Sequence, residues 1–293
     1  YQGLKRVEVP EVFAGDIVAV TGVTNAHISE TIADIQNPEA LPAIKIEEPT
    51  LRITIGANTS PFMGKEGKFV TSRQIGERLE RELETNVGFK LQTIGGGEYL
   101  LSGRGELHLS VFIETLRREG FELQISKPEV IIKEENNQKT EPVEEITVDV
   151  PEEHRGTILG ELAKRRAEMK DTFTHNADVR FVYECPTRAL LGLRTALITL
   201  TRGSAVLNSR FTRFGPQGEP LPKLRKGALL AHEAGKAVAF GLDIAQGRGV
   251  TFIEPGTEVY EGMIVGENAK DEDLAVNVCK GKQLTNMRSK SSD

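Results

Sequence analysis

The spacing of apolar and polar residues in the first half of the chain predicts a small α/β unit. Residues 51–55 and 89–91 alternate between apolar and polar side chains, which is the period of a half-buried strand. Between these two stretches, Ile75, Leu79 and Leu83 recur at helical spacing among charged neighbours. The first three predicted elements are therefore strand, helix and strand.

A tight turn then leads into the second half of the same unit. The glycines at 95–97 predict a hairpin turn into a strand over residues 98–102. A second helix and a last strand, over residues 121–125, complete the pattern. The apolar face of this second helix consists of Leu109, Phe112, Ile113 and Leu116. The order strand, helix, strand, strand, helix, strand is the split βαβ, or ferredoxin-like, arrangement.

The same order of elements is predicted a second time from residue 143 onward. Alternating strands over residues 146–150 and 179–183 flank a helix whose apolar face includes Met169. A helix over residues 188–201 and a strand over 205–214 follow, although Gly192 and Thr195 weaken the helical pattern. The sequence thus predicts two units of one topology.

We predict an α+β fold with four parts. These are the last strands of a β-barrel with a linker (1–46), two ferredoxin-like βαββαβ domains (47–136 and 137–216), and an all-β C-terminal domain (217–293). The all-β prediction rests on short apolar runs, such as 237–242 and 250–253, separated by Gly and Pro. The polar run over residues 134–141 predicts a hairpin tip or a linker. Because the chain begins without an initiator Met and ends in a polar segment, we expect it to be a fragment.

Composition narrows the classes of partner. The 293 residues carry a net charge of −6, which argues against a protein that coats duplex nucleic acid, so DNA is not an expected partner and any RNA contact has to be local. The two cysteines, Cys185 and Cys279, lie far apart and predict a reducing compartment rather than a disulfide scaffold. No apolar run approaches the ~20 residues of a membrane-spanning helix, so no membrane partner is expected.

No motif in the sequence predicts an active site. GKEGK at 64–68 lacks the spacing of a phosphate-binding loop, and we interpret residues 58–70 as a mobile polar loop that docks on a neighbouring domain or partner. The five histidines lack the spacing of a metal site, and His108 is predicted to be a packing or capping residue. Ser204 and Ser209 lack the partners of a nucleophile. We expect no catalytic residue, metal or cofactor in this chain.

One basic cluster lies on the helix predicted in the second unit. Lys164, Arg165 and Arg166 lie with Lys170 near acidic residues, among them Glu161. Opposite charges three or four residues apart on a helix form ion pairs. This pattern favours a solvated salt-bridge face over an RNA contact.

Two further basic clusters are candidate RNA-binding sites. Lys223, Arg225 and Lys226 surround a proline turn, and an RNA contact and a solvated surface fit this cluster equally well. The other cluster combines positive charges with amide donors, which is typical of contacts to phosphates and unpaired bases, the alternative being a disordered basic tail. It consists of Lys280, Lys282, Gln283, Asn286, Arg288 and Lys290.

Several segments resemble one family of translational GTPases. GRGELHL at 103–109 resembles the signature of domain III in elongation factor G-type GTPases. The wider segment 95–109, together with KPEVI at 127–131, looks most like the TypA/BipA branch. The same branch is indicated by GKAVAF at 235–240, EVYEGMIVG at 258–266 and LTNMR at 284–288. The resemblance covers essentially the whole chain.

This resemblance implies the C-terminal portion of a ribosome-binding GTPase. The four predicted parts are then the end of barrel domain II, domains III and V, and a C-terminal domain specific to TypA/BipA, while GTP and Mg²⁺ belong to a GTPase domain that the chain lacks. Domains III and V face the GTPase centre, ribosomal RNA and ribosomal proteins in this family. The C-terminal loop reaches toward the acceptor end of a tRNA, through Lys282, Asn286 and Arg288. The implied location is the bacterial cytoplasm or the chloroplast stroma.

We therefore expect a ribosome- and RNA-binding part of a TypA/BipA GTPase, without enzymatic activity of its own, that acts in translation, ribosome assembly or stress adaptation. The alternative is an intramolecular scaffold that regulates the GTPase domain and binds RNA only weakly. An independent enzyme is a third hypothesis, and the sequence offers no pocket residues in its support.

Overall fold

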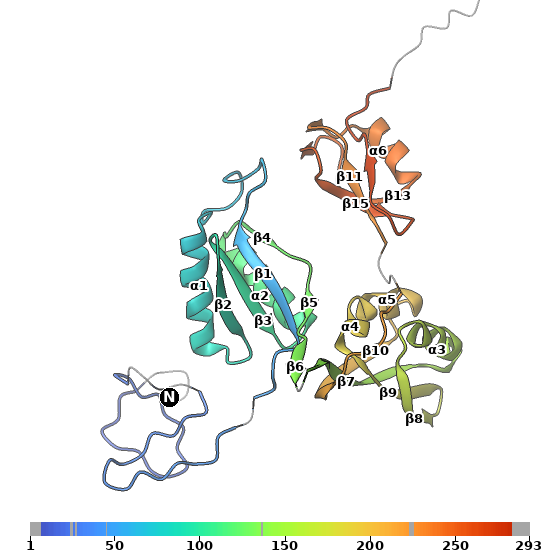
Figure 1. The fold of residues 1–293 in the computed structure, drawn as a ribbon. Helices are drawn as coiled ribbons and strands as arrows, with labels where there is room; N and C mark the ends of the chain where they lie inside the picture. The colour runs from blue at the N-terminus through green and yellow to red at the C-terminus, as the bar shows by residue number, and fades with distance from the viewer. Residues whose placement is uncertain are drawn as a thin grey trace, which may run out of the picture.

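The chain folds into three separate units (Figure 1). Each unit has its own core of buried hydrophobic side chains. The structure is a computed structural model that describes residues 7–23, 26, 28–44, 46–135, 137–222 and 226–282. We refer to the first unit (51–130), the second unit (133–216) and the C-terminal unit (226–282). Among the described helices, none is both long and apolar enough to cross a membrane.

The first unit has the predicted order of strands and helices. Its elements are β1 (Leu51–Ala57), α1 (Ser72–Thr85), β2 (Lys90–Gly95), β3 (Glu98–Gly103), α2 (Glu106–Glu119), β4 (Leu123–Ile125) and β5 (Glu129–Val130). The sheet has the order β2-β3-β1-β4, with β5 also paired to β1, and the pairs are antiparallel. This is the ferredoxin-like arrangement that the sequence predicts. Gly95, Gly96 and Gly97 all have positive φ and form the predicted hairpin turn.

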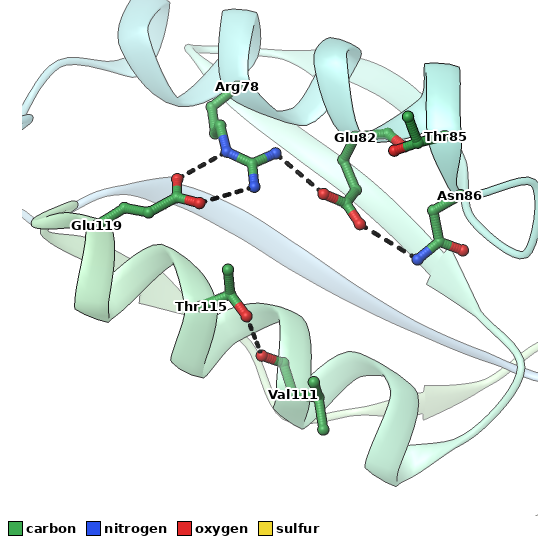
Figure 2. Close-up of polar contacts among 7 residues, drawn as sticks. All are labelled: Arg78, Glu82, Thr85, Asn86, Val111, Thr115 and Glu119. Atoms are coloured by element: carbon green, nitrogen blue, oxygen red, sulfur yellow. Dashed lines mark hydrogen bonds and ion pairs between the residues drawn. The ribbon is translucent and has the colours of Figure 1, made fainter. Parts of the chain in front are cut away.

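The two helices of the first unit are joined by a charged clamp, which Figure 2 shows. Arg78 on α1 donates two hydrogen bonds to Glu119 on α2, at 2.7 and 2.9 Å, and a third to Glu82 at 3.0 Å. The hydrogen bonds to Glu119 are the main cause that raises the pKa of Arg78. A guanidinium that binds a carboxylate through two parallel hydrogen bonds fixes orientation as well as distance. The clamp therefore holds α1 and α2 in register.

The second unit repeats this topology. Its elements are β6 (Lys133–Glu135), β7 (Gln138–Pro151), α3 (Arg155–Lys164), β8 (Glu168–His175), β9 (Asp178–Pro186), α4 (Thr187–Leu190), α5 (Leu193–Leu200) and β10 (Val206–Pro216), with a short 3₁₀ turn at Glu152–His154. The sheet order β10-β7-β9-β8 is again ferredoxin-like. The polar run between the units forms the hairpin of β6 and β7, as one of its two interpretations predicts.

Two elements of the second unit differ from the prediction. Met169 lies in β8 rather than on a helix, because α3 ends at Lys164 and Arg166 adopts a left-handed φ of 55°. The helix predicted over residues 188–201 is two helices, α4 and α5, because Gly192 adopts a left-handed φ of 69° between them. The chain therefore turns a corner at this glycine.

The C-terminal unit is rich in β-structure, as predicted, and also contains a helix. Its elements are β11 (Ala228–Ala231), β12 (Gly235–Lys236), α6 (Ala239–Gln246), β13 (Gly249–Thr251), β14 (Glu258–Val259), β15 (Ile264–Asn268) and β16 (Leu274–Val276). One sheet has the order β13-β15-β11-β16, and β12 pairs with β14. The all-β prediction is wrong at α6, where a short apolar run fits a buried helix as well as a strand.

The described residues before β1 form neither strands nor helices, in contrast to the predicted end of a barrel. Their apolar side chains are largely exposed, and Ile17 and Ile35 reach 99% and 95%. A strand requires a neighbour that accepts and donates its backbone hydrogen bonds. Within the described residues, no strand pairs with this segment, so its apolar residues do not form the strands that the sequence predicts.

Candidate functional site

The segment GRGELHL, which carries the family resemblance, lines a cavity between the first and second units. This cavity, which we call the inter-unit cleft, has a volume of about 450 Å³. The first unit and the segment before it contribute Glu47, Leu51, Arg104, Gly105, Glu106, Leu107 and His108. The second unit contributes Glu144, Thr187, Leu190, Leu191, Arg194, Leu207 and Ser209.

His108 packs against the core of the first unit, as one of the two alternatives from the sequence predicts. Its ring stacks on Phe89, with centroids 3.9 Å apart and an interplanar angle of 5°. Its Nδ1 accepts a hydrogen bond from the backbone N–H of Arg104 at 3.3 Å, just before α2 begins. Burial lowers the pKa of His108, and the positive charge of Arg104 lowers it further. The imidazole is therefore held neutral and serves the local fold.

Gly103 allows the strand before this segment to approach the core closely. A Cβ at this position would lie 3.0 Å from the Leu109 side chain and 3.1 Å from the Phe89 ring. A side chain at this position would require Leu109 or the Phe89 ring to shift by a few tenths of an ångström. The signature thus encodes the junction of β3 and α2, which forms one wall of the inter-unit cleft.

The opposite wall depends on Arg165, which is only 3% exposed. Its guanidinium donates to Glu161 at 2.9 Å and to the backbone carbonyls of Ala189 and Leu191 at 2.6 and 3.0 Å. These carbonyls belong to the corner between α4 and α5. The pairing of Glu161 with this cluster is confirmed, but Arg165 is buried rather than part of a solvated face.

The corner held by Arg165 contacts the first unit. Leu191 packs against the hydrophobic core of the first unit, and the N–H of Gly192 donates to Glu106 Oε2 at 3.4 Å. A partly buried apolar contact and a hydrogen bond thus meet at one point of the junction between the two units. The inter-unit cleft is therefore formed by a packed junction.

A buried carboxyl group lies in the inter-unit cleft. Glu144 is 6% exposed, and its Oε1 accepts a hydrogen bond from the Thr187 hydroxyl at 2.8 Å. Burial raises the pKa of Glu144, and hydrogen bonds from Thr187 and Ser209 partly oppose this effect. Sequence reasoning did not select this residue, since alternation along β7 only places it in a strand.

The charged side chains around the inter-unit cleft give it no surplus of positive charge. Arg104 and Arg194 are accompanied by three acidic side chains, those of Glu47, Glu106 and Glu144. An anion site requires a surplus of donors and positive charge. In addition, the described residues include no cluster of His, Cys, Asp or Glu suited to a metal ion. The arrangement fits a structural junction better than a ligand site.

The predicted RNA-binding residues are only partly covered by the structure. Lys226, Lys280 and Lys282 lie within the described residues. Six others fall outside them, namely Lys223, Arg225, Gln283, Asn286, Arg288 and Lys290. Lys226 makes an exposed ion pair with Glu267 on β15 at 3.7 Å.

Lys280 and Lys282 lie exposed at the end of the C-terminal unit. The preceding Val278 is buried at 1% exposure, and its carbonyl accepts a hydrogen bond from Val238 at 2.9 Å, just before α6. This anchor fixes the chain immediately before the two lysines. Both lysines are exposed, and within the described part of the chain neither makes an ion pair.

Comparison with protein families matches two parts of the chain. Residues 138–223 match the family model described as elongation factor G C-terminus. Residues 226–293 match the model described as TypA/BipA C-terminal domain. These ranges include nearly all of the second unit and all of the C-terminal unit.

The whole chain is similar to curated bacterial proteins that carry one name, large ribosomal subunit assembly factor BipA. The relative from Bacillus subtilis (strain 168) is 48% identical over 296 residues, covering 100% of this chain and 48% of the relative. That from Synechocystis is 48% identical, covering 100% and 49%. That from Escherichia coli (strain K12) is 46% identical, covering 99% and 48%. The chain spans about half the length of these relatives.

Proposed function

This chain belongs to the TypA/BipA family, and on that basis we propose that it is the ribosome- and RNA-binding C-terminal portion of a translational GTPase. The name of the relatives supports assembly of the large ribosomal subunit as the process, with translation or stress adaptation as related settings. In this proposal GTP and Mg²⁺ bind a GTPase domain of the full-length protein. The place of action is the bacterial cytoplasm, or the chloroplast stroma for a plastid protein.

The observation that carries the RNA-binding proposal is the exposure of two lysines at the end of the C-terminal unit. Lys280 and Lys282 are exposed and make no ion pair among the described residues. Several exposed arginines on the first two units are paired, as Arg117 and Arg118 are with Glu114, at 2.7 and 2.8 Å, whereas others, such as Arg81 and Arg202, are exposed as well. Since phosphate contacts require accessible positive charge, and the family resemblance assigns the RNA-facing loop to the same end of the chain, the C-terminal end is the proposed RNA contact.

The family's tRNA-facing loop would extend this surface. By resemblance it includes Lys282, Asn286 and Arg288, of which Lys282 is described. Amide and guanidinium groups in a loop contact phosphates and the edges of unpaired bases, so recognition would depend on RNA shape more than on sequence. Ribosomal RNA and the acceptor end of a tRNA are therefore the proposed nucleic-acid partners.

The packed junction between the first two units favours a second candidate function. Leu191 and Glu106 join these units at the inter-unit cleft, and several of their exposed cations, among them Arg117, are already paired with acidic side chains. Such units suit an intramolecular scaffold that orients the GTPase domain and binds RNA weakly. The two functions differ in whether the isolated chain binds ribosomes.

Cosedimentation of the 293-residue chain with purified large ribosomal subunits separates the two functions. Direct RNA binding predicts that the chain pellets with the subunits at low salt and is released as salt rises, because counterions compete for phosphate contacts. If the chain stays in the supernatant at every salt concentration, the RNA-binding proposal is wrong and the scaffold function is favoured.

A further inference from the structure

The loop between β1 and α1, residues 58–70, is organised around one carboxylate of the first unit. Glu122 accepts hydrogen bonds from the backbone N–H groups of Gly64, Glu66 and Gly67 at 2.7, 2.8 and 2.7 Å. It also accepts one from the Asn58 side chain at 3.3 Å. A carboxylate that receives several backbone donors fixes the loop in one conformation.

Backbone hydrogen bonds join the C-terminal end of the same loop to the residues that follow α2. The N–H groups of Lys68 and Phe69 donate to the Gly120 carbonyl at 2.8 and 3.1 Å, and Glu122 N–H donates to the Phe69 carbonyl at 3.0 Å. The rings of Phe69 and Phe121 lie 4.7 Å apart. The loop is therefore preorganised on the first unit, and its tip projects away from the sheet (Figure 1).

The tip of this loop contacts the C-terminal unit. Lys65 Nζ lies 3.0 Å from Glu258 Oε2 on β14. Next to it, the Phe62 ring meets the Tyr260 ring edge to face, at 5.1 Å and 88°. Lys65 also lies over the Phe62 ring, 4.2 Å from its centroid. These two loop residues are thus held together by a cation–π contact and meet two residues of the other unit at one place.

This contact is reversible by its nature. The side chains of Lys65 and Glu258 are 50% and 57% exposed, and exposed ion pairs contribute little and are screened by salt. A single edge-to-face aromatic pair is also a weak contact. The first unit and the C-terminal unit are thus held by contacts that a competing partner or a change in salt can break.

We propose that residues 58–70 form an intramolecular clasp, a preorganised docking element whose partner is the two-stranded sheet of β12 and β14 in the C-terminal unit of the same chain. The clasp sets the orientation of the C-terminal unit and hence the direction in which Lys280 and Lys282 point. Its opening removes this contact and so changes the orientation of the C-terminal unit relative to the first unit. The inference stands independently of the proposed RNA binding, because it concerns the free chain.

Zero-length carbodiimide crosslinking of the full chain, followed by peptide mass spectrometry, tests the clasp. The reagent forms an amide bond between a lysine amine and a carboxylate that are in direct contact, so a Lys65–Glu258 crosslink is expected. Tyr260→Ala should lower its yield at least threefold relative to a link between Lys236 and Glu258, which are paired across β12 and β14. Lys68→Ala, on the same loop but outside the contact, should leave the yield unchanged. A Lys65–Glu258 yield that Tyr260→Ala leaves unchanged overturns the proposal.

A charge swap provides a second, independent readout. The distance between spin labels on α1 and on α6 should have one narrow distribution in the unsubstituted chain at low salt. Lys65→Glu should broaden this distribution, and adding Glu258→Lys should restore it. Lys68→Glu is the matched control for the same change of charge. If the single swap leaves the distribution narrow, or the double swap fails to restore it, the clasp does not set the orientation.

Discussion

The buried guanidinium of Arg165 donates a hydrogen bond to the backbone carbonyl of Leu191 at 3.0 Å. This contact ties α3 to the corner between α4 and α5, and Leu191 of that corner, which is partly buried, packs against the core of the first unit. One side chain therefore stabilises both the second unit and its junction with the first. The inter-unit cleft depends on this relationship as well as on Glu106 of the family signature, which accepts a hydrogen bond from Gly192.

Replacement of Arg165 by Met should destabilise the second unit by about 3 kcal/mol, because it leaves the partly buried Glu161 and the carbonyls of Ala189 and Leu191 without their buried guanidinium partner. Urea unfolding, followed by amide hydrogen exchange in β7 and β9, measures the change. Lys164→Met is the control, since Lys164 is 69% exposed and 3.6 Å from the same Glu161. It should change stability by no more than about 0.5 kcal/mol. Equal effects of both variants would show that Arg165 does not hold the corner.

Arg78→Lys should destabilise the first unit by about 1–2 kcal/mol, because an ammonium cannot reproduce the two parallel hydrogen bonds to Glu119 or reach Glu82 as well. The matched control is Arg73→Lys on the same helix. Arg73 is also paired, with Glu77 at 2.8 Å, but its side chain is 88% exposed. Hydrogen exchange of the α1 and α2 amides should show a larger loss of protection for Arg78→Lys than for Arg73→Lys. If Arg78→Lys leaves this protection unchanged, the clamp does not stabilise the first unit.

Glu144 should make the second unit less stable as the pH rises. Its folded-state pKa is raised above 4.5 by burial, so between about pH 4.5 and that raised value the folded state binds more protons than the unfolded state. Stability from this group is therefore present at low pH and lost as the pH rises through the folded pKa. Glu144→Gln keeps an acceptor for Thr187 and removes the titration. The variant should be as stable as the parent chain below pH 4.5 and more stable than the parent chain above it. Urea unfolding midpoints measured at several pH values test this expectation.

Glu122 should give the clasp loop, residues 58–70, the opposite pH dependence: the loop should become less stable as the pH falls. Backbone hydrogen bonds, from Gly67 first and then Gly64 and Glu66, lower its pKa to about 2. A lowered folded-state pKa gives stability that is complete above the ordinary value of 4.5 and is lost as the pH falls toward 2. Protection of the Gly64 and Gly67 amides should therefore fall over this interval. Glu122→Gln should lose the protection at neutral pH, and retained protection would contradict the assignment.

Much of the fold follows from the sequence because its strands are half-buried. Ile146, Val148 and Val150 alternate with polar residues, and the same residues form the buried face of β7. The α6 helix could not be predicted in the same way, because its apolar run is too short for periodicity to separate helix from strand. Met169 was wrongly predicted to lie on a helix, because it follows Leu162 by seven residues and so fits a helical spacing. In the structure it lies on β8 with its side chain exposed.

The candidate site was less accessible to prediction because it depends on contacts between distant segments. Arg165 follows Ile158 and Leu162 at helical spacing, so its position on the buried face of α3 could be predicted from the sequence. Its partners at the α4–α5 corner could not be predicted in this way. Lys65 and Glu258 are 193 positions apart, and nothing in either segment specifies the other. The predicted RNA-binding set stays a prediction, with Lys280 and Lys282 shown to be exposed.

The most direct test of the account is the salt dependence of binding to large ribosomal subunits. A plot of log affinity against log salt should be steep for the parent chain. Lys282→Ala with Arg288→Ala should reduce its slope by about one for each phosphate that is no longer bound. Arg117→Ala with Arg118→Ala removes the same number of charges from residues already paired with Glu114, so the slope should not change. An unchanged slope and affinity in the Lys282→Ala, Arg288→Ala chain would contradict the claim that the C-terminal end binds RNA.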